Sequence, residues 1–193
     1  MPGAYGSTVG LVSMGVIGRQ VRERLRMLNV NVIAYDPFVS AEQAREYDIE
    51  MVALDEVFRR ADVVSLHTPW LPETERLVTG ALIASMKEGA TLINTSRGAV
   101  IAEDEMISVL AMRPDLTAML DVTHPEPPAP DSPLLRLPNV FLTPHIAGAM
   151  HNECRRLGRF MVDELRRYVN GEPLIGAIDP VAAKNSTHRV LAD

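Results

Sequence analysis

The chain has 193 residues with a net charge of −6, and 47% of its residues are hydrophobic and 23% charged. This length provides one full core, and the composition is that of an ordinary soluble globular protein. The acidic balance, without a dense Lys/Arg run, argues against a nucleic-acid surface, and no apolar stretch nears membrane-spanning length.

The number of cysteines and the N-terminal residues give further information on the kind of protein and its location. The single cysteine, Cys154, excludes a disulfide framework and a cysteine metal cluster. The first residues, MPGAYGS, lack the charged and apolar regions of a signal peptide. We therefore expect a cytoplasmic protein with no membrane partner and no metal.

Apolar runs alternate with helical patterns along the whole chain, which predicts βα units and a parallel sheet. Strands are expected at Thr8–Val12, Asn31–Tyr35, Glu50–Val52, Asp62–Leu66, Thr91–Asn94, Leu116–Asp121 and Val140–Leu142. Helices are expected at Val16–Leu28, Ala41–Tyr47, Leu54–Arg60, Leu82–Met86, Glu103–Met112 and Asn152–Val169. The strand runs are continuously apolar rather than alternating, so we expect helices to cover both faces of the sheet.

Two segments near the C-terminal end are read as loop and tail. Residues 124–138 hold six prolines, which predicts an extended, stiff loop without regular structure. Residues 1–175 are expected to form one domain, followed by a partly disordered tail at 176–193.

The loop between the first strand and the first helix has the pattern of a dinucleotide site. Such a fingerprint needs one glycine for the tight turn, one where the backbone meets pyrophosphate and one for helix–strand packing. Gly15 and Gly18 fill the second and third roles, and Ser13 stands in the first. Serine suits that turn only if its backbone avoids positive φ. The free amides and positive dipole end of the helix remain available to phosphate.

An acidic residue ends the second strand. Asp36 lies 18 residues after Gly18, where a carboxylate would bind the adenosine ribose hydroxyls. Pro37 and Phe38 supply no positive charge for a 2′-phosphate, which favours NAD over NADP. S-adenosylmethionine enzymes share the glycine loop and the ribose acid, so this segment alone leaves that alternative open.

Three further segments each close an apolar run: Asn94–Gly98, Asp121–Glu126 and Thr143–Gly148. The loops after parallel strands lie side by side at the crevice where ligands bind. An arginine, a carboxylate and an imidazole would therefore converge there. These three side chains together can bind a carboxylate and transfer a proton, which indicates redox chemistry on a hydroxy or keto acid.

Taken together, these motifs are similar to those of a known protein family. The chain resembles the nucleotide-binding domain of the D-isomer-specific 2-hydroxyacid dehydrogenases, over about residues 8–175. The matching motifs are the glycine loop, Tyr35–Pro37, Ser65–Pro69 with Pro72–Thr74, Asn94–Gly98, Leu120–Val122 with Pro125–Pro127, and Pro144–Gly148. The resemblance implies a doubly wound parallel sheet, the Rossmann fold, with the substrate domain of the family largely absent.

The resemblance also implies catalytic roles that agree with the residue types. Arg97 would hold the substrate carboxylate and polarise its carbonyl, because a guanidinium is permanently charged and presents a fork of donors. His145 would exchange a proton with the substrate oxygen, since imidazole changes charge near neutral pH. Glu126 would fix the imidazole ring. Hydride would pass between the nicotinamide and C2 of the substrate.

Other matched positions touch the cofactor in the family. By resemblance, Val16 and Ile17 lie against the pyrophosphate, and Asp121 binds the nicotinamide carboxamide. The expected cofactor-binding set is Ser13, Gly15, Val16, Ile17, Gly18, Asp36, Pro69, Thr74, Thr95, Ser96, Arg97, Asp121, His145 and Gly148. His67 and His124 are interpreted as structural histidines, and Trp70 as a packing residue.

The expected function is therefore an NAD-dependent oxidoreductase of the D-2-hydroxyacid dehydrogenase type. Without a substrate domain, Arg97 and His145 would face solvent, so an NAD(H)-binding sensor or interaction module without turnover is the alternative. The last helix adds a stripe at helical spacing, Leu157, Phe160, Met161, Leu165 and Tyr168, which predicts self-association as a homodimer.

Overall fold

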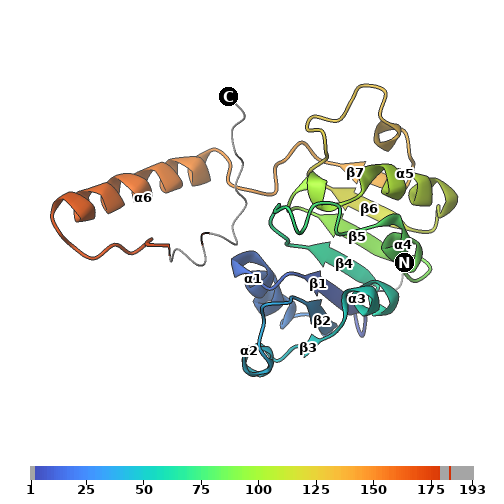
Figure 1. Ribbon diagram of the computed structural model, residues 1–193, viewed down its shortest axis with the longest axis horizontal. Helices are drawn as coiled ribbons and strands as arrows, with labels where there is room; N and C mark the ends of the chain where they lie inside the picture. The colour runs from blue at the N-terminus through green and yellow to red at the C-terminus, as the bar shows by residue number, and fades with distance from the viewer. Residues whose placement is uncertain (1–2, 179–182, 184–193) are drawn as a thin grey trace.

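The structure is a computed structural model that describes residues 3–178 and residue 183. Seven strands form one parallel sheet in the order β3-β2-β1-β4-β5-β6-β7 (Figure 1). The strands are β1 (Thr8–Val12), β2 (Asn31–Tyr35), β3 (Glu50–Met51), β4 (Val63–Leu66), β5 (Thr91–Asn94), β6 (Thr117–Leu120) and β7 (Val140–Leu142). The α-helices are α1 (Val16–Leu25), α2 (Ala41–Glu46), α3 (Leu54–Arg60), α4 (Gly80–Ala84), α5 (Glu103–Met112) and α6 (Asn152–Val169). The predicted doubly wound sheet is confirmed.

The two faces of the sheet carry separate hydrophobic clusters. The larger cluster joins α3, α4 and α5 to side chains such as Val64, Leu92 and Leu120. The smaller cluster packs the apolar side of α1 on the opposite face, against Val9 and Leu11. Successive strand residues point to opposite faces, which separates these two sets. Each fully buried large side chain contributes about 1.5–3 kcal/mol to stability.

The smaller cluster covers only half of its face. On that face the register aligns Ile93 with Met119 and Met119 with Phe141, and none of the three belongs to either cluster. Met119 is 40% exposed and Phe141 58% exposed. The expectation that both faces are covered is therefore wrong over β5–β7. Because α1 and α2 link β1 to β3 while α3–α5 lie on the other face, no described helix crosses this surface.

Local sequence signals explain where the elements begin and end. The Ser40 hydroxyl and Gln43 form a capping box at α2, and the Thr79 hydroxyl accepts from Leu82 N–H at the start of α4. That cap begins α4 at Gly80, two residues before its predicted start. Helix α1 ends at Leu25, three residues before its predicted end.

The proline-rich loop contains one turn of regular structure that was not expected. Pro133–Leu135 form the 3₁₀ helix η2, in which Leu134 is buried and the Ser132 side chain accepts from its amide. A second 3₁₀ turn, η1, spans Gly98–Val100.

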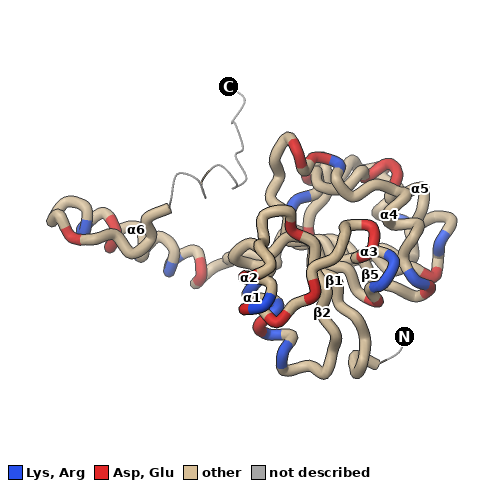
Figure 2. Tube along the Cα trace, turned by 60° about the horizontal axis from the view of Figure 1, so that its bottom comes forward, with Lys and Arg blue, Asp and Glu red and all other residues tan. Residues whose placement is uncertain are grey.

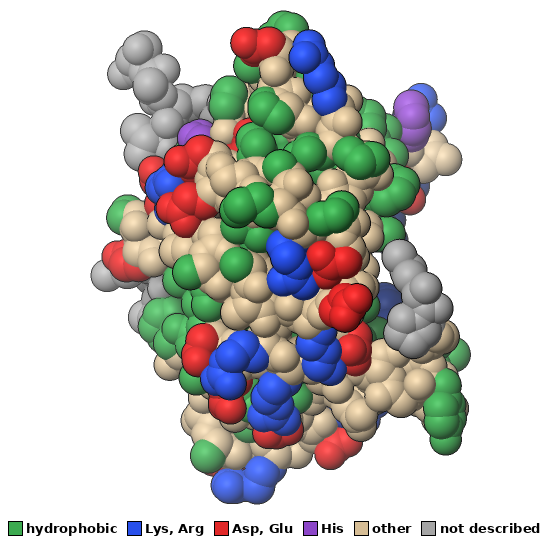
Figure 3. Space-filling view, turned by 90° about the vertical axis from the view of Figure 1, so that its right-hand side faces the viewer, with side chains coloured by type: hydrophobic (Ala, Val, Ile, Leu, Met, Phe, Trp, Pro, Cys, Tyr) green, Lys and Arg blue, Asp and Glu red, His purple; other side chains and the backbone are tan. Residues whose placement is uncertain are grey.

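Figure 3 views the molecule from the right-hand side of Figure 1, and hydrophobic side chains gather in its upper part, above a mixed group of basic and acidic side chains.

Helix α6 has the predicted boundaries, Asn152–Val169, and extends away from the sheet (Figure 1). The segment after it returns along the helix, where Gly176 N–H donates to Glu164 Oε2 at 2.7 Å. Of the expected tail at 176–193, all but residues 176–178 and 183 lies outside the described residues. No helix in the described part of the chain is both long and apolar enough to cross a bilayer.

Candidate functional site

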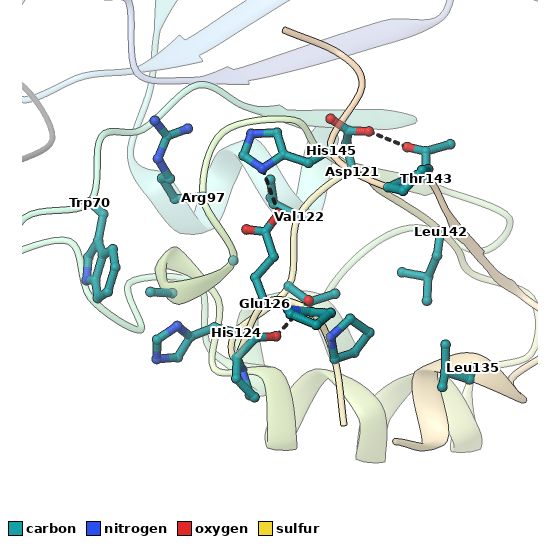
Figure 4. Close-up of a pocket in the computed structure, with 17 residues that line it drawn as sticks. Trp70, Arg97, Asp121, Val122, His124, Glu126, Leu135, Leu142, Thr143 and His145 are labelled. Carbon is teal, nitrogen blue, oxygen red and sulfur yellow. Dashed lines mark hydrogen bonds and ion pairs between the residues drawn. The ribbon is translucent and has the colours of Figure 1, made fainter. Parts of the chain in front are cut away.

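The three predicted loops converge at the carboxyl edge of β5, β6 and β7. They line an open cleft of about 1010 Å³ whose walls include Arg97, Asp121, Glu126 and His145. Figure 4 shows Arg97, Glu126 and His145 grouped in this cleft, with Trp70 at one side. The prediction that a guanidinium, a carboxylate and an imidazole share one cleft is confirmed by this geometry.

A buried asparagine shapes the turn that carries Arg97. The side chain of Asn94 is fully buried, and its Nδ2 donates to the carbonyl of Arg97 at 2.9 Å. Its Oδ1 accepts from the amide and the hydroxyl of Ser96, at 3.0 and 2.8 Å. Arg97 itself is exposed and, within the described residues, forms no ion pair. Sequence reasoning did not assign Asn94 a role, although its place at the end of a buried strand was a usable signal.

The imidazole and the glutamate form a short pair. His145 Nδ1 lies 2.6 Å from Glu126 Oε1, and the side chains are 45% and 40% exposed. Because Glu126 engages Nδ1, Nε2 is the nitrogen left for a substrate. A carboxylate that accepts from Nδ1 fixes the ring orientation and stabilises the imidazolium. This is the geometry expected of an oriented acid–base group.

Asp121 clamps the loop that carries His145. Its Oδ1 accepts from Thr143 Oγ1 at 2.5 Å and from Ile146 N–H at 2.9 Å, and its Oδ2 accepts from Ala147 N–H at 2.8 Å. Burial raises the pKa of Asp121, but these hydrogen bonds and the nearby His145 outweigh burial and lower the pKa overall. His145 has a φ of 54°, a left-handed conformation that costs about 1–3 kcal/mol and is held by its surroundings.

The same carboxylate was expected to bind a nicotinamide carboxamide. Both of its oxygens are instead engaged by the protein itself, and only 4% of Asp121 is exposed. The expected contact with the cofactor stays a prediction. The structure adds a positioning role that the sequence did not reveal.

Gly98 permits the first two loops to approach one another. A Cβ at this position would lie 2.1 Å from the backbone carbon and oxygen of Thr123. Only glycine allows that contact, because the obstacle is backbone that cannot rotate away. The close approach brings the Arg97 turn against the segment that leads to Glu126.

The glycine loop departs from the expectation at its first position. Ser13 has a φ of 77°, so it adopts the left-handed turn that we expected serine to avoid. Its hydroxyl lies 3.0 Å from Thr68 Oγ1, which anchors the side chain in this conformation. The surrounding fold therefore holds Ser13 in a left-handed conformation that is energetically unfavourable for a residue other than glycine.

The other two glycines match their expected roles. A Cβ at Gly18 would lie 2.2 Å from the Ser13 carbonyl oxygen, so Gly18 is needed for close packing. A Cβ at Gly15 would meet nothing within 4 Å, which leaves open space beside the start of α1. Helix α1 has no side-chain cap and no acidic residue in its first turn, and Val16 and Ile17 are exposed. This uncapped helix start, with open space beside Gly15, suits a diphosphate.

Asp36 organises the same loop from the end of β2. Its Oδ2 accepts from Met14 N–H at 2.7 Å, and its Oδ1 accepts from Phe38 N–H at 2.8 Å. A carboxylate thus stands beside the glycine loop, as the ribose-binding role requires. The glycine loop and Asp36 do not line the cleft of Arg97 and His145, but β1 and β5 flank the same neighbour, β4.

The remaining predicted contacts lie on loops of the same edge. Thr74 Oγ1 donates to the Pro69 carbonyl at 2.6 Å and accepts from Leu71 N–H, which closes the loop after β4. Thr95 and Gly148 are exposed, and a Cβ at Gly148 would meet nothing within 4 Å. Their contacts with a cofactor stay predictions.

The two other histidines of this region are held by the protein. His67 Nε2 lies 3.1 Å from Ser65 Oγ, and burial lowers the pKa of His67 to about 4. The His124 ring packs edge-on against Trp70 at 5.2 Å, and its amide donates to Glu103. Burial raises the pKa of Glu103, and the bond from His124 partly offsets the rise. Among the described residues, no group of three His, Cys, Asp or Glu side chains could hold a metal ion.

Comparison with known proteins gives a consistent result. The sequence profile described as "D-isomer specific 2-hydroxyacid dehydrogenase, NAD binding domain" matches residues 2–147. The D-3-phosphoglycerate dehydrogenase of Archaeoglobus fulgidus is 34% identical over 174 residues, covering 90% of this chain and 33% of that protein. The (S)-sulfolactate dehydrogenase of Chromohalobacter salexigens is 40% identical over 163 residues, covering 84% of this chain and 53% of that protein.

Solved structures show the same likeness. The D-lactate dehydrogenase of Lactobacillus jensenii, solved with NAD+, has a TM-score of 0.77 and 28% identity, covering 90% of this chain and 56% of that one. The chain therefore spans about a third to just over half of the length of the relatives it matches.

Proposed function

The chain belongs to the D-isomer specific 2-hydroxyacid dehydrogenases as their NAD-binding domain, and from this premise we propose that it takes part in oxidising a 2-hydroxy acid or reducing a 2-keto acid. The observation that carries the proposal is the shared cleft of Arg97, His145 and Glu126, with the 2.6 Å pair between the last two. The glycine loop with Asp36 is the proposed cofactor site. Its open space at Gly15 and its uncapped helix start fit a dinucleotide.

The residues of this chain would handle the substrate as follows. Arg97 pairs with the substrate carboxylate, because it is exposed at the cleft and forms no ion pair with the described residues. His145 Nε2 accepts the hydroxyl proton when the alcohol is oxidised and returns it to the carbonyl oxygen when the keto acid is reduced. Glu126 accepts from Nδ1 and stabilises the imidazolium that forms. A nicotinamide cofactor held at the glycine loop and Asp36 would supply the redox chemistry, as acceptor or donor of the hydride at C2.

An absorbance assay with NADH and a panel of 2-keto acids tests the proposal. We expect slow NADH oxidation, and a loss on the order of 10²–10⁴-fold in kcat/KM for His145→Ala. Arg97→Ala should instead raise KM, and Arg97→Lys should recover only part of the loss because it lacks the fork of donors.

Glu42→Ala, on the exposed side of α2, is the matched control that should change neither constant. NADH binding without turnover of any acid would contradict the catalytic proposal. It would favour the alternative function, an NAD(H)-binding sensor or interaction module, for which the partial exposure of His145 and Glu126 is the supporting observation.

We propose further that the chain forms a homodimer. The supporting observation is the exposed apolar stripe of α6, in which Leu157, Met161 and Leu165 are 52%, 63% and 61% exposed. The expected cytoplasmic location and the domain limits at 1–175 stay predictions.

A further inference from the structure

The proline-rich loop that carries Glu126 has few hydrogen bonds to the rest of the domain. Four of the eight residues at 124–131 are prolines, which have no backbone N–H to donate. In the described chain, one hydrogen bond joins the backbone of residues 124–131 to another element: His124 N–H donates to Glu103 Oε2 at 2.8 Å. Helix α6 projects from the side of the body away from α5 (Figure 2), and no described hydrogen bond links it to this loop. Glu103 therefore connects the loop to α5.

The carboxylate of Glu103 lies in an unusual place for the first residue of a helix. An acidic side chain in the first turn is normally exposed, where the helix dipole stabilises it. Glu103 begins α5 but is half-buried, and burial raises its pKa. The N–H of His124 lowers this pKa in part, whereas the neighbouring Asp104 raises it. Burial of a charged group is unfavourable unless the group is hydrogen-bonded, so the bond from His124 offsets the desolvation of Glu103.

The position of Glu103 separates it from a substrate in the cleft. The cleft of Arg97 and His145 is lined by His124 and Glu126 but not by Glu103. Glu103 lines a second hollow of about 440 Å³, which His124 also borders. Figure 4 shows Glu126 between His124 and His145. Glu103 can therefore act on the cleft through the loop that begins at His124, and not by touching a ligand there.

We propose that Glu103 is a positioning residue for the acid–base pair: by holding the His124 amide, it keeps Glu126 within hydrogen-bond distance of His145 Nδ1. The inference rests on the proposed roles of His145 and Glu126, but it does not depend on turnover. Because Glu126 Oε1 lies 2.6 Å from Nδ1, it holds the neutral ring as the Nδ1–H tautomer and leaves Nε2 free to accept a proton. A neutral ring without this partner exchanges between both tautomers.

Nitrogen-15 NMR of the imidazole rings tests the proposal. Spectra are recorded at about pH 9, where an ordinary imidazole is neutral, and the His145 signals are identified by their loss in His145→Gln. We expect the Nδ1–H tautomer to predominate in the wild type and both tautomers to be present in Glu126→Ala. Glu103→Ala should lose the Nδ1–H preference as Glu126→Ala does. Glu103→Gln should keep it, because its amide oxygen still accepts from His124 N–H.

Asp104→Ala is the matched control. Asp104 follows Glu103 in the first turn of α5 and pairs with Arg76 at 2.8 Å, outside the proline-rich loop. Its loss removes the same charge from the start of the helix, so the wild-type tautomer is expected. Circular dichroism on each variant verifies that the fold is kept. Where Glu103→Ala does not fold, Glu103→Leu takes its place, because leucine fills the half-buried site without an acceptor.

The outcomes separate this inference from the proposed function. The wild-type tautomer in Glu103→Ala, or mixed tautomers in both Glu103→Ala and Asp104→Ala, would overturn the positioning role. The same tautomer mixture in the wild type and in Glu126→Ala would refute the pair and both proposals with it. The expected tautomer pattern without turnover of any keto acid would refute hydride transfer and would support the role of Glu103.

Discussion

The carboxyl edge of the sheet and helix α6 differ in how their side chains are used: those of the edge are buried and hold the backbone, whereas those of α6 are mostly exposed. At the edge, buried polar groups such as Asn94 and Asp121 hold backbone amides and carbonyls in place. Along α6 nearly every side chain is exposed, and no tertiary bond ties the helix to the sheet among the described residues. The cleft is therefore fixed by hydrogen bonds within the chain, whereas no described hydrogen bond fixes α6 against the sheet.

The largest expected difference between the two regions comes from a pair of glycines. Gly98→Ala should destabilise the fold by about 4 kcal/mol or more, because the new methyl group overlaps the Thr123 backbone. Gly158→Ala, in the exposed middle of α6, should be neutral or stabilising by up to about 1 kcal/mol, because its Cβ meets nothing within 4 Å. Urea unfolding measures both. Equal effects would mean that the close approach at the cleft is not rigid.

The next effect concerns pH. The folded-state pKa of His67 is about 4, below its ordinary value of 6.5, because burial penalises the charged ring. The unfolded chain therefore binds a proton first, and stability should fall by up to about 3 kcal/mol as the pH drops from about 6.5 to 4. His67→Gln should remove most of this slope in urea melts across that range. An unchanged slope would place the acid sensitivity in another group.

A smaller effect should follow from Asn94→Ala. Loss of its three hydrogen bonds should cost about 2 kcal/mol of stability and should raise KM for a keto acid through Arg97. Asn94→Asp is the sharper variant, since it keeps the acceptor for Ser96 and removes the donor to the Arg97 carbonyl. Ser108→Ala, on the exposed side of α5, is the control. If KM stayed the same in both Asn94 variants, the turn would hold its shape without the asparagine.

Most of the fold was predictable from the sequence because its signals are local. The limits of β1, β2, β5, β7, α3, α5 and α6 follow from apolar periodicity and turn residues, and the site motifs come directly after strands. What could not be predicted depends on the register between distant segments. The positive φ of Ser13, the clamp of Asp121 on residues 143–147 and the open face at Phe141 each arise only once the sheet is assembled.

The central claim is that the glycine loop at the end of β1 receives the diphosphate of NAD. Calorimetric titration with NADH tests it on the wild type and on Gly15→Val, where the added Cβ would enter open space with no other protein atom within 4 Å. The account predicts saturable heat for the wild type and at least tenfold weaker binding for the variant at an unchanged melting temperature. Equal binding by both proteins, or no heat with either, would contradict it.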